Sequence, residues 1–113
     1  YGRLNPSGSV FSLTGPHGRY INRPLASPLK VTEGAGGIGE AIAANKVRGI
    51  RAARCCSVED AKLSREHNDA NVMSLGGRMV PLTQAIEMVD MFLSTDFSGG
   101  RHTARVNDLE SPL

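Results

Sequence analysis

The stretch Thr32-Glu33-Gly34-Ala35-Gly36-Gly37-Ile38-Gly39-Glu40-Ala41-Ile42-Ala43-Ala44-Asn45-Lys46 decides the fold of this chain. It follows a short, mostly apolar run, gathers its glycines between positions 34 and 39, and then becomes rich in alanine. Glycine permits positive φ and close backbone approach, whereas alanine favours helix. The stretch therefore predicts a strand, a glycine loop and the start of a helix, in that order.

The predicted glycine loop is also a candidate anion site. A helix that begins there points unpaired backbone N–H groups, and the positive end of its dipole, at any group held in the loop. Such a cradle would suit a phosphate or an oxyanion formed during a reaction. Gly34, Gly36, Gly37 and Gly39 would form it. Glu40 follows in the first helical turn and would be either a helix-stabilising carboxylate or a base that removes a proton from carbon.

Length and composition limit the remaining possibilities. The 113 residues suffice for one small domain, and only 4% of them are aromatic, so the core must be mainly aliphatic. No apolar window approaches about 18 residues, and no basic-then-apolar segment opens the chain. The adjacent Cys55 and Cys56 suit neither a disulfide framework nor a metal cluster. We therefore expect a reducing, cytoplasmic setting, no membrane span, no metal and no cofactor.

The rest of the chain predicts alternating strands and helices. Prolines and glycines interrupt residues 1–28, for which we expect an irregular or disordered leader. The expected strands are Leu29–Thr32, Ile50–Cys56 and Asn71–Leu75. The expected helices run from Gly37 or Ile38 to Val47, from the N-cap Ser57 to about Glu66, along a stripe of apolar residues, and from Arg101 to Leu109. That stripe comprises Leu82, Ala85, Ile86, Val89, Phe92 and Leu93.

This alternation predicts an α/β fold over residues 29–113, a three-layer sandwich with a parallel, Rossmann-like sheet. Ligands of such sheets bind at the carboxyl ends of the strands. We expect the glycine loop, Glu66-His67-Asn68 and Gly76-Gly77-Arg78 to meet at that rim.

Two polar groups in the chain, His67 and the pair Arg101 and Arg105, allow two interpretations each. His67 would be structural or catalytic, and its neighbour Asn68 could donate a hydrogen bond to an oxyanion. Arg101 and Arg105 lie at i and i+4 on one helical face, which suits either phosphate oxygens or a solvated basic surface. Cys55 and Cys56 lie in a predicted strand, where we expect both in the core.

Two binding functions, dinucleotide binding and nucleic-acid binding, are weaker than the anion site at this point. Gly34-x-Gly36-x-x-Gly39 fits the dinucleotide fingerprint, which requires an acid about 20 residues further on, at the end of the next strand. That strand ends in Cys55-Cys56, so a dinucleotide-binding fragment is the weaker hypothesis. The first 32 residues carry Arg3, Arg19, Arg23 and Lys30 and no acid. They lack an aromatic-basic pattern, so we expect no nucleic-acid contact.

Three long motifs resemble the ribose-5-phosphate isomerase B and galactose-6-phosphate isomerase family. They are Gly37 to Ala53, Ala61 to Val72 and Gly99 to Val106, in the family's order, and the resemblance covers about Val31 to Leu109. It implies an enzyme that interconverts aldose and ketose phosphates, such as ribose 5-phosphate and ribulose 5-phosphate, without a metal.

The resemblance also implies roles for individual residues. Glu40 matches the base of one branch of the family, whereas another branch has a Cys at the position of Gly34. His67 matches the residue that assists opening of the sugar ring, Asn68 matches a substrate contact, and the glycine loop matches the cradle of a cis-enediolate. The positions that match phosphate-binding arginines are Arg78, Arg101 and Arg105. Because the family's site lies between two subunits, Arg101 and Arg105 would serve the site of the partner.

The chain also departs from the family. Gly36 stands where the glutamate branch commonly has Ser or Thr, and residues 1–28 resemble nothing of the family's front, which carries an Asp-His pair. We therefore expect a truncated or divergent chain whose open sheet edge and apolar helix faces need a homodimer, a homotetramer or another chain to cover them. A non-catalytic isomerase-like subunit that binds phosphate or a partner is the alternative to the enzyme.

Overall fold

The computed structural model describes residues 29–111, so the leader predicted over residues 1–28 lies outside the described part. The elements are β1 (Lys30–Gly34), α1 (Ile38–Asn45), β2 (Ala52–Cys55), α2 (Val58–Asn68), β3 (Val72–Gly76), α3 (Leu82–Ser94) and α4 (His102–Glu110). The predicted order of strands and helices is confirmed, with ends that differ from the prediction by one to a few residues.

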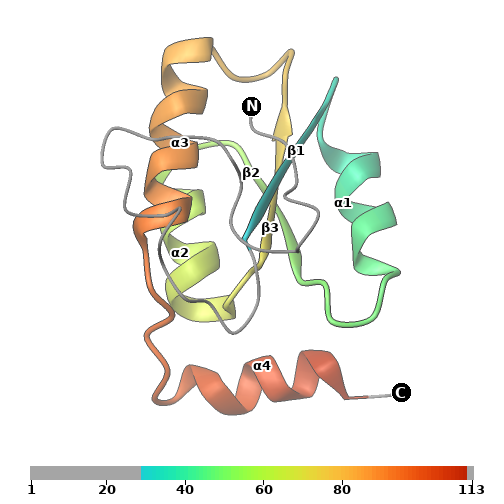
Figure 1. Ribbon diagram of the computed structural model, residues 1–113, viewed down its shortest axis with the longest axis vertical. Helices are drawn as coiled ribbons and strands as arrows, with labels where there is room; N and C mark the ends of the chain where they lie inside the picture. Colours follow the sequence, from blue (N-terminus) through green and yellow to red (C-terminus); the bar gives the residue numbers. More distant parts are fainter. Residues whose placement is uncertain (1–28, 112–113) are drawn as a thin grey trace.

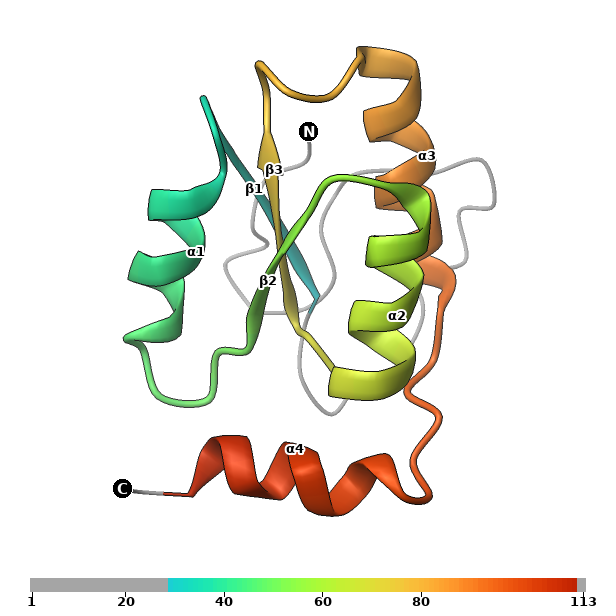
Figure 2. The ribbon, with the colours of Figure 1, turned by 180° about the vertical axis from the view of Figure 1, so that it is seen from behind.

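The three described strands form a parallel sheet in the order β1-β3-β2. All residues of β3 are buried, as expected for a central parallel strand that is covered on both faces. Figures 1 and 2 show α1 on one face of this sheet and α2 with α3 on the other. The predicted three-layer α/β sandwich is therefore confirmed.

The apolar core lies between the sheet and the pair α2 and α3. Its largest fully buried side chains are Phe92, Met73, Leu75, Met88 and Leu93. The α1 face of the sheet differs, because Ala41 is the one buried residue of α1. On that face the Ser74 hydroxyl donates a 2.6 Å hydrogen bond to the Gly37 carbonyl. Hydrogen bonds and close backbone contact therefore hold α1 more than apolar burial does.

The predicted apolar stripe of α3 is partly wrong. Leu82 is 70% exposed and Ile86 is 53% exposed, whereas Met88, which the stripe omitted, is buried. The sheet and α2 cover a narrower sector of α3 than the hydrophobic pattern spans. Leu109 of α4 is likewise exposed, although Val106 one turn earlier is buried. These uncovered apolar side chains form the apolar helix faces whose exposure the sequence predicted.

Capping explains both ends of α2. The Ser57 hydroxyl accepts the Asp60 N–H at 3.0 Å, so the predicted N-cap is confirmed. The Asp60 carboxylate in turn accepts the N–H of Cys56, which is exposed at the start of the helix and not in the core. The helix ends beyond the predicted Glu66, at Asp69, whose φ of 48° stops it. None of the described helices is long and apolar enough to cross a membrane.

Candidate functional site

The glycine loop is pressed against the end of the central strand. Beyond the paired strands, the Gly77 N–H donates to the Gly34 carbonyl at 2.7 Å and the Arg78 N–H to the Ala35 carbonyl at 3.1 Å. Gly37 has φ of 75°, and a Cβ there would lie 2.8 Å from the carbonyl carbon of Leu75. Only glycine satisfies both conditions. Gly37 therefore fixes where α1 begins.

Two side chains from neighbouring strands orient the peptides of the loop. Arg54 Nε donates to the Gly36 carbonyl at 2.7 Å, and Ser74 donates to the Gly37 carbonyl. In a trans peptide the N–H points opposite to the C=O. The N–H groups of Gly37 and Ile38 are therefore turned away from the sheet. This orientation is the one that an amide cradle for an anion requires.

Glu40 lies directly beside this cradle. It is partly buried in the first turn of α1, as predicted. A Cβ built on Gly34 would fall on the Glu40 carboxylate, so the absence of a side chain at position 34 is what admits this group. The carboxylate thus packs over the end of β1, next to the peptides that Arg54 and Ser74 orient.

We call this end of the sheet the carboxyl-end rim, formed by residues 34–40, 76–78 and Arg54. Arg78 belongs to it, because its backbone N–H is bonded to Ala35 and its side chain is exposed. The predicted meeting of the glycine loop with Gly76-Gly77-Arg78 is confirmed. Sequence reasoning missed Arg54 and Ser74, although an arginine near the end of a short strand was a usable signal.

The expectation that Glu66-His67-Asn68 lies at the carboxyl-end rim, beside the glycine loop of the same chain, is wrong. Helix α2 starts near the carboxyl end of β2 and runs back, so it ends beside the start of β3, where α4 also lies (Figure 1). We call this opposite end the amino-end rim, formed by residues 66–69 and α4. The His67 ring stacks on the ring of His102, with centroids 4.3 Å apart. Arg101 and Arg105 are exposed at this same rim.

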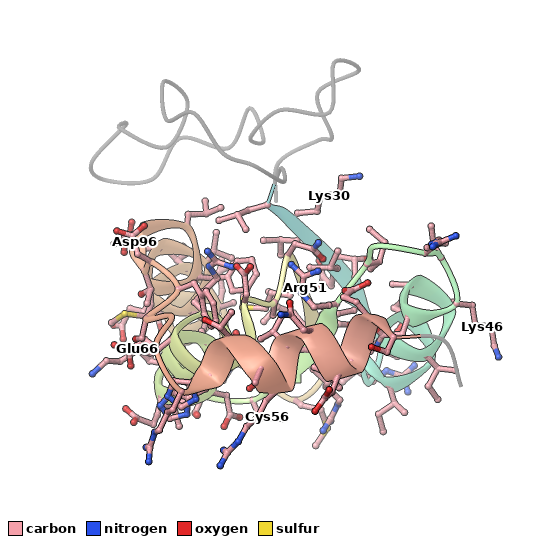
Figure 3. The ribbon with its side chains drawn as sticks, turned by 90° about the horizontal axis from the view of Figure 1, so that it is seen from below. Lys30, Lys46, Arg51, Cys56, Glu66 and Asp96 are labelled. Atoms are coloured by element: carbon pink, nitrogen blue, oxygen red, sulfur yellow. The ribbon has the colours of Figure 1, made fainter. Side chains whose placement is uncertain are left out.

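Ion pairs fix the amino-end rim. Arg51 donates to Glu110 of α4 at 2.6 Å and to Asp69 at 3.3 Å, and Arg65 donates to the other Asp69 oxygen at 2.9 Å. Figure 3 views this end from below and shows Arg51 behind α4. Partly exposed pairs of this kind contribute about 0–1 kcal/mol each. Their main effect is to set α4 against the end of α2, and with it the histidine pair.

A cavity of about 480 Å³ opens at the amino-end rim. The connection from α1 to β2 and the C-terminal part of α4 line it, together with Asn68, Arg51 and Glu110. Asn68 therefore borders this cavity and not the glycine loop of its own chain.

Burial governs the titration of two groups. Burial, followed by the charges of His67, Arg101 and Arg105, lowers the pKa of His102, which is 8% exposed, while Glu66 acts in the opposite direction. Burial raises the pKa of the Cys55 thiol to about 11, so this thiol stays protonated at neutral pH and is a poor nucleophile. Among residues 29–111, no three His, Cys, Asp or Glu side chains cluster in a way that could hold a metal ion.

Comparison with known proteins identifies the family of this chain. The sequence profile of the Ribose/Galactose Isomerase family matches residues 25–109. The chain belongs to this family. Ribose-5-phosphate isomerase B of Mycolicibacterium paratuberculosis is 46% identical over 90 residues, which cover 77% of this chain and 57% of the relative. The Escherichia coli protein of the same name is 50% identical over 70 residues, covering 62% of this chain and 47% of that relative.

A solved structure agrees with the sequence comparisons. Ribose-5-phosphate isomerase B from Mycoplasma genitalium with bound ribulose-5-phosphate superposes with a TM-score of 0.73 at 39% identity, over 75% of this chain and 56% of that one. The family resemblance and the parallel α/β fold predicted from the sequence are thus confirmed. The chain spans about half the length of the relatives that it matches.

Replacing Gly34 with alanine should displace the Glu40 carboxylate with little loss of stability, because the added methyl group meets only the far end of a flexible side chain. Crystal structures of the variant and of Gly36→Ala would show this. At Gly36 an added Cβ meets nothing within 4 Å, so Glu40 should stay in place. A Glu40 carboxylate in its original position in Gly34→Ala would contradict the steric assignment.

The lowered pKa of His102 should make stability fall in acid. The unfolded chain, in which the histidine has its ordinary pKa near 6.5, binds more protons than the folded chain as the pH drops below that value. We expect NMR titration to give His102 a pKa below 6.5. The free energy of unfolding of His102→Asn should depend less on pH between 7.5 and 5.5. An equal pH dependence of the free energy of unfolding in both proteins would refute the assignment to His102.

Proposed function

We propose that the chain is a subunit of an aldose–ketose isomerase that acts on a sugar phosphate of the ribose 5-phosphate type. The observation that carries this proposal is the Glu40 carboxylate over Gly34, beside oriented amides of the glycine loop. Membership of the Ribose/Galactose Isomerase family supports it, as does the relative whose structure holds ribulose-5-phosphate.

The chemistry of the carboxyl-end rim fits a proton transfer between carbons. In the open-chain aldose, Glu40 would take the proton from C2, and the electron pair would move onto the carbonyl oxygen to form a cis-enediolate. The N–H groups of Gly37 and Ile38 would stabilise the developing negative charge. Glu40 would then return the proton to C1, while the hydroxyl proton moves from O2 to O1, which gives the ketose.

A complete site would require two copies of the chain. His67, Asn68, Arg101 and Arg105 lie at the amino-end rim, at the opposite end of the sheet from Glu40. In a two-fold dimer, the amino-end rim of one copy would face the carboxyl-end rim of the other. His67 would assist ring opening, and the arginines, with Arg78, would bind the phosphate. Exposed apolar side chains near both rims, such as Met79 and Leu109, suit such an interface.

The same geometry disfavours a dinucleotide. A pyrophosphate in the loop would lie beside the Glu40 carboxylate and be repelled. In the isomerase, the carboxyl group becomes neutral as it takes the proton, so no such repulsion opposes the enediolate. The non-catalytic subunit remains a second candidate, because the chain spans only about half the length of its relatives.

Glu40→Gln should reduce turnover of ribose 5-phosphate by at least about a hundredfold, because glutamine keeps the shape of the side chain but does not accept the proton. Conversion to ribulose 5-phosphate by the purified chain measures this. Glu87→Gln, on exposed α3 surface, serves as the matched control and should keep full activity. Full activity of Glu40→Gln would remove Glu40 from the mechanism. Absence of turnover with retained phosphate binding in the unaltered chain would favour the non-catalytic subunit.

Mixing two inactive variants should restore activity if the site is shared. Glu40→Gln and His67→Asn would each be impaired alone. In a mixed dimer, one of the two sites would combine an intact Glu40 with an intact His67 from the other copy. With random exchange, about a quarter of the unaltered activity should return. No recovery after exchange of subunits, verified by mass spectrometry, would show that the two residues do not act across an interface.

A further inference from the structure

We propose that Arg54 is a positioning residue of the amide cradle: it holds the Gly36 carbonyl so that the next N–H faces the bound oxyanion. This inference rests on the proposed function, in which the glycine loop stabilises an enediolate. Arg54 is neither a base nor a phosphate ligand in this proposal. It acts through the peptide that joins Gly36 to Gly37.

The position of Arg54 in the sheet allows this contact. It pairs in register with Ser74 of the central strand, so both residues lie on the α1 face near the carboxyl ends of their strands. From there the guanidinium reaches across β3 to the loop, where Nε donates to Gly36 at 2.7 Å. The Gly36 carbonyl oxygen itself lies over Gly76, 2.8 Å from where a Cβ would be. The arginine thus ties the end of β2 to the loop after β1.

Gly36 is the part of the loop that most needs such an anchor. The Gly36 carbonyl touches Gly76, but a Cβ built on Gly36 meets nothing within 4 Å, so that side of the residue is open. Glycine also has no side chain to restrict the rotation of its peptide. Gly37, in contrast, is held by close backbone contact and by Ser74. Within residues 29–111, Arg54 is the hydrogen-bond donor to the Gly36 carbonyl.

Loss of this anchor has a predictable chemical consequence. If the peptide between Gly36 and Gly37 flips, a carbonyl oxygen replaces an N–H group at the mouth of the cradle. An acceptor there repels an enediolate, whereas a donor stabilises it. Removing a single oxyanion donor lowers kcat by about 10²–10³ in known enzymes. The guanidinium also places a positive charge beside the cradle, because its Nε is bonded to the loop.

The test compares Arg54→Leu with Arg48→Leu in the 113-residue chain. Both substitutions remove one exposed arginine, but Arg48 lies in the connection after α1, at the amino-end cavity. We expect Arg54→Leu to lower kcat for ribose 5-phosphate at least about tenfold and to change KM less than about threefold, since the oxyanion forms after binding. Arg48→Leu should keep both constants. Arg54→Lys, which retains a donor and the charge, should recover part of kcat.

A second measurement does not depend on turnover. Amide hydrogen exchange at Ala41 and Arg78, whose N–H groups donate to the loop carbonyls of Gly37 and Ala35, should accelerate at least about fivefold in Arg54→Leu and stay unchanged in Arg48→Leu. Unchanged exchange, or unchanged kcat in an active protein, overturns the proposal. If the unaltered chain shows no turnover, the proposed function fails by itself, and the exchange rates still decide whether Arg54 holds the loop. Equal loss of kcat in Arg54→Lys and Arg54→Leu with unaltered exchange would also count against it.

Discussion

The close contact of Gly37 with the end of β3 is the constraint on which the candidate site depends. With φ of 75° and its α-carbon against the main chain of Leu75 and Gly76, this residue lets the chain turn from β1 into α1 without a gap. A larger residue would push α1 away from the sheet. Ser74 would then lose its carbonyl partner, and the first turn, which carries Glu40, would no longer lie over Gly34. One glycine therefore sets the position of the Glu40 carboxylate relative to the amides.

A second constraint comes from the parallel sheet. Strands that run in the same direction must be joined by elements that return along the face of the sheet, so each helix ends at the rim where the next strand begins. The end of α2 is consequently far from the loop after β1, whatever its sequence. If residues at the end of α2 act with Glu40, as proposed, they come from another molecule. The parallel topology itself thus favours a site shared between copies.

Much of this arrangement could be predicted from residue patterns. The glycine loop, the N-cap at Ser57 and the strand that became β3 are local, and local rules found them. The rim of His67 and Asn68 was predicted wrongly, because adjacency to a helix end says nothing about which end of the sheet that helix reaches. The outer positions of α3 were also predicted wrongly. Hydrophobic periodicity shows which face of a helix is apolar, but it does not show how much of that face the neighbouring elements cover. In α3 they leave Leu82 and Ile86 exposed.

Arg54 was hidden for a different reason. In the sequence it is a charged residue inside a predicted strand with no visible partner, and the structure gives that charge a partner on the loop. The pairing matters for the electrostatics of the cradle. Before reaction, the Glu40 carboxylate and the Arg54 guanidinium flank the same loop with opposite charges. In the proposed reaction, Glu40 would become neutral when it takes a proton, and the guanidinium would be left without its counter-charge at the moment when the enediolate appears. The field of the rim would then favour an anion most strongly in the state that carries one.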